Sequence, residues 1–252
     1  MMIHAKAQVA AAAAGLATVL ACSAPTAVAA DPLVLSDVRW VAEPAAGKQG
    51  APRLRISHAR SSSDQTLDGS RADFAAAEAE LRRAAAGPVS FSIVHQSGTL
   101  SCTGDMRRAF DGDGRCRFTS DAGFEQRLAE RGLAPGERAS LLAMLLTGAT
   151  IELADGLAGA GVRADDANDL IAAAALHLTP DYVRDINAGP LKLTALDDAF
   201  AYKALGIDGA YLRGLAEAGY TTLSPEEVMG MKATGVSPDY ARAMNRAARG
   251  GQ

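Results

Sequence analysis

Residues 178–186 read LTPDYVRDI, and this stretch decides how the second half of the chain folds, because related residues return at a fixed offset of 29 positions. Two columns of the sequence show the offset most clearly: Tyr182, Tyr211 and Tyr240, and Arg184, Arg213 and Arg242. Self-similarity at a fixed period of this length is typical of proteins built from stacked helical units. The sequence therefore predicts a repeat array in this half of the chain.

A further column extends the pattern one unit toward the N-terminus: Thr150, Thr179, Asp208 and Ser237. All four are favoured N-cap residues, and Pro180 and Pro238 follow at the first helical position, where proline is over-represented. Another column lies near the start of the preceding helix in each unit: Leu141, Leu170, Ala199 and Val228. A unit of 29 residues holds two helices of about 10 residues and two turns, so we predict four helical-hairpin repeats over residues 134–252.

Neighbouring units are expected to share one core, because a single two-helix unit cannot bury its apolar face alone. The apolar columns of this core are Leu178, Ile207 and Val236, and Ile186, Leu215 and Met244. The first unit, residues 135–161, carries Leu153 and Asp155 in the tyrosine and arginine columns. We therefore expect this unit to cap the array against the region that precedes it.

Residues 31–133 change to the alternating apolar pattern of short strands. The positions that indicate strands are Val38, Trp40, Leu54, Ile56, Val89, Phe91, Ile93, Leu100 and Phe118. Helical spacing relates Phe74, Ala77, Leu81 and Ala84, and again Phe124 and Leu128. Residues 44–52 and 61–66 are expected to be loops by composition. The fold class is thus α+β, a small antiparallel β domain with one or two helices followed by an all-α array.

The first thirty residues have the pattern of a secretory signal peptide. Lys6 precedes an apolar run over residues 7–21, and the small residues 27–29 suit cleavage after Ala29 or Ala30. An alternative is the lipobox-like sequence of residues 19–22, which would leave a lipidated Cys22 at the mature N-terminus. We therefore expect a periplasmic or secreted protein, attached to a membrane only if Cys22 is lipidated.

Export leaves two cysteines to consider, because Cys22 is either removed with the leader or lipidated. Cys102 and Cys116 lie on neighbouring expected strands, and residues 111–114, Asp-Gly-Asp-Gly, are expected to form the turn between them. Disulfides persist in oxidising compartments. We predict a Cys102–Cys116 disulfide, which stabilises the fold by about 3 kcal/mol in the chain-entropy model.

The composition argues against several classes of function. Twenty-five Lys and Arg against 29 Asp and Glu, for a net charge of -4, do not make the basic surface of a nucleic-acid-binding protein. His58, His95 and His177 lack metal-ligand spacing, so no metal site is expected. Residues 156–161 are glycine-rich but end an expected helix, which favours helix capping over cofactor binding. No catalytic motif and no cofactor are predicted.

The repeats also resemble a known group of sequences. Residues 235–244, GVSPDYARAM, and residues 178–186 are similar to the Gly-Val-Thr-Pro-Glu-Tyr-Val-Arg-type helical repeats of bacterial extracytoplasmic proteins. Some of these repeats are appended to membrane metallopeptidase sensors of the β-lactamase-regulator type, and residues 87–104 resemble the sheet segment that precedes them. The resemblance implies an extracytoplasmic interaction or sensing module. It does not extend to peptidase activity, because the chain has no His-Glu-x-x-His motif.

The repeated columns supply the candidate partner-binding residues: Arg184, Arg213, Arg242, Lys203, Lys232, Tyr182, Tyr211 and Tyr240. They could form a basic stripe that binds a protein partner along the array. The competing interpretation is a solvated face whose arginines pair locally with Asp181, Asp185 and Asp239.

We predict a non-enzymatic envelope protein that binds a protein partner through its helical repeats. One alternative is an envelope hydrolase that uses the carboxylates of Asp165, Asp166 and Asp169, although charges of this kind are also favourable at a helix N-terminus. Another alternative is a lipid-anchored scaffold, which depends on Cys22.

Overall fold

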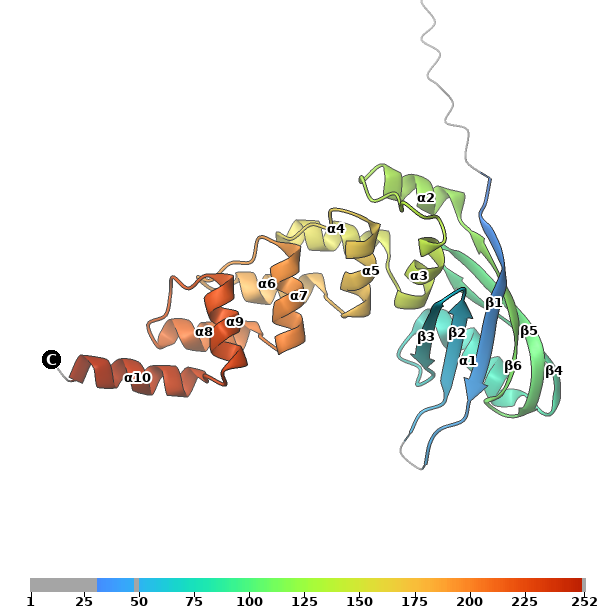
Figure 1. The fold of residues 1–252 in the computed structure, drawn as a ribbon, viewed down its shortest axis with the longest axis horizontal. Helices are drawn as coiled ribbons and strands as arrows, with labels where there is room; N and C mark the ends of the chain where they lie inside the picture. The colour runs from blue at the N-terminus through green and yellow to red at the C-terminus, as the bar shows by residue number, and fades with distance from the viewer. Residues whose placement is uncertain (1–30, 48–49, 251–252) are drawn as a thin grey trace, which may run out of the picture.

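The computed structural model describes residues 31–47 and 50–250, so the expected signal peptide and Cys22 lie outside the described residues. The chain combines one antiparallel sheet with a series of helices (Figure 1). The six strands have the order β3-β2-β1-β6-β5-β4 in the sheet. Their bounds are β1 (Val34–Glu43), β2 (Arg53–His58), β3 (Ser61–Thr66), β4 (Gly87–His95), β5 (Gly98–Arg108) and β6 (Asp111–Ser120).

The sheet has one buried face and one face open to solvent, as the alternation of its strands predicts. The buried face carries Val38, Trp40, Leu54, Ile56, Phe91, Ile93, Leu100 and Phe118. Helix α1 (Ala75–Arg83) follows a 3-10 turn over Ala72–Phe74 and packs against β4. Arg39, Thr103 and Arg115 alternate with buried neighbours and are exposed on the open face.

Cys102 and Cys116 form the predicted disulfide, with an S–S distance of 2.00 Å. The two cysteines face each other in the β5–β6 ladder. The expected turn at residues 111–114 is wrong, because the turn comprises Ala109 and Phe110, and Asp111 already begins β6.

Both glycines of residues 111–114 lie where a side chain would clash: Gly112 against Asp105 and Met106 of β5, and Gly114 against Trp40. A Cβ atom on Gly114 would lie 2.7 Å from the Trp40 Nε1 atom, and one on Gly104 would lie 2.6 Å from its Cζ2 atom. The indole Nε1–H of Trp40 donates to the Thr103 carbonyl oxygen at 3.1 Å. Glycine in a strand often marks such a close approach.

Residues 61–66, expected to be a loop, form the edge strand β3 instead. All six residues pair with β2, from His58 opposite Ser61 to Arg53 opposite Thr66. The polar composition hides the strand, because polar residues suit an edge that faces water on one side. Gln65 also donates its Nε2–H to the Leu146 carbonyl oxygen at 3.0 Å, which ties this edge to the helical part.

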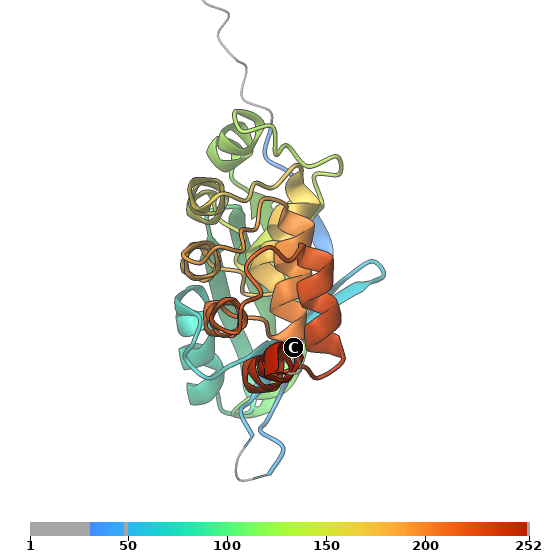
Figure 2. The same cartoon turned by 90° about the vertical axis from the view of Figure 1, so that its left-hand side faces the viewer.

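The helical part begins with α2 (Ala122–Ala129), and eight helices follow it in residues 140–250: α3 (Ser140–Thr147), α4 (Ile151–Ala160), α5 (Ala167–Ala175), α6 (Pro180–Asn187), α7 (Leu196–Leu205), α8 (Gly209–Glu217), α9 (Pro225–Ala233) and α10 (Pro238–Gly250). Helices α4, α6, α8 and α10 pack on one another in succession. Helices α5, α7 and α9 lie across them in a second layer (Figure 1, Figure 2).

The predicted N-caps are confirmed at all four positions. The side chains of Thr150, Thr179 and Asp208 accept a hydrogen bond from the backbone N–H three residues ahead, and Ser237 accepts from Tyr240 N–H at 3.1 Å. Two residues before each cap the backbone has positive φ, in Gly148, His177, Gly206 and Gly235. The left-handed residue and the N-cap together turn the chain from one layer into the other.

The apolar columns form the expected core with one exception. Leu178, Ile186, Ile207 and Leu215 are buried and Val236 is partly buried against the same core, whereas the Met244 side chain is 51% exposed. The prediction of a buried Met244 is wrong because no further helix in the described residues packs over α10.

Among the described residues, no single helix is long and apolar enough to cross a membrane. Helices α3 and α4 reach the length and apolar composition of a membrane span only when they are counted as one segment. The two helices are bent by 74° relative to each other.

Candidate functional site

The tyrosine column contacts the helix pair that follows it in the chain. The Tyr211 hydroxyl donates to the Val236 carbonyl oxygen at 2.8 Å, and the Tyr182 hydroxyl donates to the Ile207 carbonyl oxygen. In both cases the acceptor lies 25 residues further along the chain. Burial raises the pKa of both phenols, so they stay protonated donors at neutral pH. Two of the candidate partner-binding tyrosines therefore hold consecutive helix pairs together.

The lysine column covers the same tyrosines. Lys203 Nζ lies 4.7 Å from the ring centroid of Tyr182, and Lys232 Nζ lies 4.6 Å from that of Tyr211. A cation over an aromatic face is attracted by its quadrupole, by about 0.5–1 kcal/mol at exposed sites. The two lysines thus contribute to the same contacts between helix pairs.

The arginine column makes the local ion pairs of the competing interpretation. Arg184 pairs with Asp181, and Arg242 pairs with Asp239 at 3.3 Å, each within one helix turn. Arg213 reaches back to Asp185 of the preceding helix pair at 2.7 Å. The guanidinium of Arg213 lowers the pKa of Asp185, so the pair is ionised at neutral pH. The arginine side chains remain partly exposed, at 43–57%.

Helices α4 and α6 contact each other in the same way as helices α8 and α10. A Cβ atom on Gly156 would lie 2.6 Å from Pro180 Cγ, and one on Gly214 would lie 2.6 Å from Pro238 Cβ. Two amides make matching bonds across these interfaces. Asn187 Nδ2 donates to Ala160 O at 3.2 Å, and Asn245 Nδ2 donates to Ala218 O at 2.5 Å.

Helices α6 and α8 use a different contact. Gly209 N–H donates to Asp185 Oδ2 at 3.2 Å, and a Cβ atom on Gly209 would lie 2.4 Å from that oxygen. Glycine therefore permits the close approach at each of these three interfaces.

The outer face of α10 carries an exposed apolar stripe. Tyr240 is 56% exposed and Met244 is 51% exposed, whereas Tyr211 and Leu215, which occupy the same columns one helix pair earlier, are 7% and 0% exposed. Ala243 and Ala247 are exposed at the three- and four-residue spacing of the same helix face. We call Tyr240, Ala243, Met244 and Ala247 the end stripe; the helix that carries it, α10, lies at the end of the molecule that faces the viewer in Figure 2.

The carboxylates of the hydrolase alternative cap a helix. Asp166 accepts from the backbone N–H groups of Asn168 and Asp169, and Asp169 accepts from Asp165 N–H at 2.9 Å. The Asp169 N–H lowers the pKa of Asp166, which is the opposite of the shift that a general acid needs. These contacts are those of a helix N-terminus.

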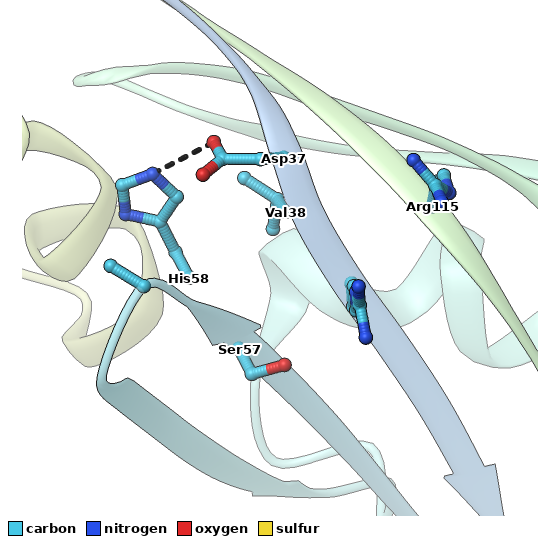
Figure 3. A pocket seen from close by; sticks show the side chains of 7 residues that line it. Asp37, Val38, Ser57, His58 and Arg115 are labelled. Carbon is cyan, nitrogen blue, oxygen red and sulfur yellow. Dashed lines mark ion pairs between the residues drawn. The ribbon is translucent and has the colours of Figure 1, made fainter.

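A hollow of about 400 Å³ opens where β1 and β2 separate (Figure 3). The β1–β2 ladder stops at Arg39 opposite Ser57. Beyond it, His58 Nε2 lies 3.0 Å from Asp37 Oδ1. Arg39 and Arg115 also line the hollow and face each other across the β1–β6 ladder.

A second hollow of about 490 Å³ lies between the β2–β3 hairpin and α3. Its apolar lining includes Ile56, Leu142, Ala143 and Leu146, and Ser61, Ser62 and Ser63 line the strand side. His58 and Ala59 line both hollows, so the two meet at the β2–β3 turn. Sequence reasoning missed this region, because the register that brings Arg39 opposite Arg115 cannot be obtained from strand patterning alone.

Within residues 31–47 and 50–250, no group of three or more His, Cys, Asp and Glu side chains is placed to hold a metal ion. Comparison with protein-family models, with curated protein sequences and with solved structures finds no match for this chain.

Proposed function

We propose that this protein is a non-enzymatic interaction module, in which residues 134–252 form four 29-residue repeats and the end stripe binds a partner protein. The repeat organisation is supported by contacts that recur at equivalent positions. The caps, the left-handed residues before them, the tyrosine hydroxyl bonds and the lysine–tyrosine contacts each return in successive helix pairs.

The observation that carries the proposal is the difference between Tyr211 and Tyr240. Tyr211 is covered by the next helix pair, which supplies both a carbonyl acceptor and a lysine over its ring. Tyr240 presents the same side chain at 56% exposure. Exposed contiguous apolar surface of this kind often marks a protein–protein interaction site, and the end stripe continues the surface that already joins the helix pairs within the chain.

The chemistry of the end stripe suggests the chemistry of the partner. The alanines allow a helix to approach closely, and Tyr240 and Met244 supply an aromatic and a thioether anchor. Arg242 and Arg246 are four residues apart and lie on one side of the stripe, and Arg246 makes no ion pair within the described residues. We therefore expect an amphipathic helix with one acidic flank. Of the candidate partner-binding residues, Tyr240 and Arg242 would contact it directly, and the others would hold the array together.

The proposed location is the cell envelope. The Cys102–Cys116 disulfide is consistent with an oxidising compartment, and the leader-like pattern of residues 1–30 supports export. Lipid anchoring through Cys22 is the alternative, and the mass of the mature N-terminal peptide distinguishes the two.

Site-specific photo-cross-linking tests the proposal. A photoreactive phenylalanine analogue at position 240, in the full chain in its native cells, is expected to give one discrete adduct. Introducing Met244→Asp in the same chain is expected to abolish that adduct, because a buried unpaired carboxylate opposes apolar docking.

The same analogue at Ser92, on the open face of the sheet, serves as the matched control. An adduct at position 240 that survives Met244→Asp, or that also forms from position 92, would contradict the proposal. An adduct of twice the mass of the chain would assign the end stripe to self-association and would also overturn the proposal of a distinct partner.

A further inference from the structure

We propose that the two hollows beside the β2–β3 turn form one binding site for a small amphiphile, with its carboxylate or phosphate head between Arg39 and Arg115 and its apolar chain against α3. This site lies in the sheet domain and does not depend on the proposed function of the end stripe.

Arg39 and Arg115 supply the positive charge at the first hollow. They lie directly opposite each other on adjacent strands, and like charges in that position destabilise a sheet. Neither guanidinium forms an ion pair within residues 31–47 and 50–250. An anion between two guanidinium groups relieves this repulsion and accepts charge-assisted hydrogen bonds from both.

The acids near the head position do not replace that anion. Asp37, on the same side of the hollow, is 3.0 Å from His58 Nε2 (Figure 3). Glu137 lines only the second hollow, on the α3 side. The hydroxyl of Ser57 lines the head position and is a further donor.

The sheet is open where the head would enter. The β1–β2 ladder ends at Arg39 and Ser57, and the β1–β6 pairing shifts its register between Leu35 and Val38. Irregular pairing of this kind is frequent beside binding sites. Where β1 and β2 are no longer paired, the hollow of about 400 Å³ lies between β1 and the β2–β3 turn.

The second hollow suits an apolar chain. Leu142, Ala143 and Leu146 of α3 line it with apolar side chains, and its volume of about 490 Å³ is within the usual range for small-molecule sites. Toward the C-terminal end of α3, Gln65 and Arg71 donate to the carbonyl oxygens of Leu145 and Leu146. These bonds join the edge strand to the helix, so the apolar chain would enter from the His58 end.

Displacement of a dansylated undecanoate probe from the purified full chain tests the proposal, with dodecanoate, dodecyl phosphate and the neutral dodecanol as competitors. We expect saturable binding of at least one of the two anionic ligands. The double variant Arg39→Gln/Arg115→Gln is expected to weaken that binding about tenfold or more, as the loss of charge-assisted hydrogen bonds implies, and to leave dodecanol binding unchanged. The tighter of the two anionic ligands identifies the head group.

Two further variants test the contact with the head group and the contact with the apolar chain separately. Arg117→Gln removes a charge from the same face of β6 outside the hollow and is the matched control, with an expected change of less than about twofold, since only a screened long-range interaction is lost. Ala143→Trp is expected to weaken the binding of all three ligands, because the larger side chain fills the second hollow. Circular dichroism checks that this variant is folded.

Absence of saturable binding to the unaltered chain would overturn the proposal. So would binding that Arg39→Gln/Arg115→Gln leaves unchanged. Arginine-dependent binding of an apolar peptide with a free C-terminal carboxylate, but not of the alkyl ligands, would assign the site to a peptide and would equally overturn the amphiphile.

Discussion

Tyr211 and Tyr240 are the same residue type at equivalent positions, yet the structure gives them different roles. The Tyr211 hydroxyl satisfies the Val236 carbonyl oxygen, whereas Tyr240 is 56% exposed. Tyr211→Phe is expected to lower the free energy of unfolding by about 1 kcal/mol, because that carbonyl loses its partner. Tyr240→Phe is the matched control and is expected to change it by less than about 0.5 kcal/mol.

Urea denaturation of the two variants measures the difference. Equal losses of stability in both variants would mean that the Tyr211 hydroxyl bond does not join consecutive helix pairs.

His95 predicts a pH dependence of stability. Its Nε2 atom is buried without a hydrogen-bond partner among the described residues, and burial lowers its pKa from 6.5. The unfolded chain therefore binds a proton more readily than the folded chain as the pH falls below 6.5. Stability is expected to fall over this window, by at most about 1.4 kcal/mol per pH unit for one proton.

His95→Phe is expected to flatten this dependence, because the variant has no group to titrate at this position. Thermal unfolding between pH 7.5 and 5.5 measures the effect. The depressed pKa of Glu125, caused chiefly by its bond with Arg138, acts only below the ordinary glutamate pKa of 4.5 and so does not interfere. An unchanged slope in His95→Phe would contradict the assignment.

At this scale the sequence predicts the residues whose role is local. The N-caps at Thr150, Thr179, Asp208 and Ser237 and the ion pairs Arg184–Asp181 and Arg242–Asp239 are found in the structure because each joins residues within one turn of the chain. The approach of Arg39 to Arg115 was not predictable, because it depends on the register of strands that are far apart in the chain.

At the scale of helices and strands, α8 packs closely against α10 at Gly214, which has no side chain to keep them apart. A Cβ atom on Gly214 would lie 2.6 Å from Pro238 Cβ, so Gly214→Ala is expected to destabilise the C-terminal helices by about 1–3 kcal/mol through overpacking. Gly230 in α9 has nothing within 4 Å of the same position. Gly230→Ala is therefore expected to stabilise by up to about 1 kcal/mol through helix propensity.

Denaturant unfolding followed by circular dichroism compares the two glycine variants. The account requires opposite signs, and stabilisation by Gly214→Ala would show that α8 and α10 do not approach closely in solution.

Strands and helices differ in how well the sequence predicts them. The apolar strands and α1 follow their periodicity, whereas β3 was missed because its six polar residues carry no alternation and acquire their structure by pairing with β2. The glycines at the start of β6 resemble a turn in the sequence, and only their close contacts explain them, with Asp105 and Met106 for Gly112 and with Trp40 for Gly114. Tertiary contacts therefore override local composition in both corrections.

For the whole molecule, the sequence separates a sheet region from a helical region and predicts that the first unit lies against the sheet region, but it does not predict the contacts that join them. Arg71 donates to the Leu145 carbonyl oxygen at 2.9 Å, and Gln96 accepts from Ile151 N–H at 3.3 Å. Both bonds connect residues more than 50 positions apart. These contacts place the first helix pair against the sheet, so the end stripe lies at the opposite end of the helical part.

The central claim is that this end stripe is built to receive another helical element. Amide hydrogen exchange of α10 tests it most directly, in the unaltered chain and in a variant with a copy of residues 193–221 placed directly after Gly250. The copied Lys203 and Ile207 would then stand in the same relation to Tyr240 as the originals do to Tyr182. The account predicts slower exchange in residues 238–248 and a protected added unit. Unchanged exchange in α10, with an added unit that exchanges as an unfolded chain, would contradict it.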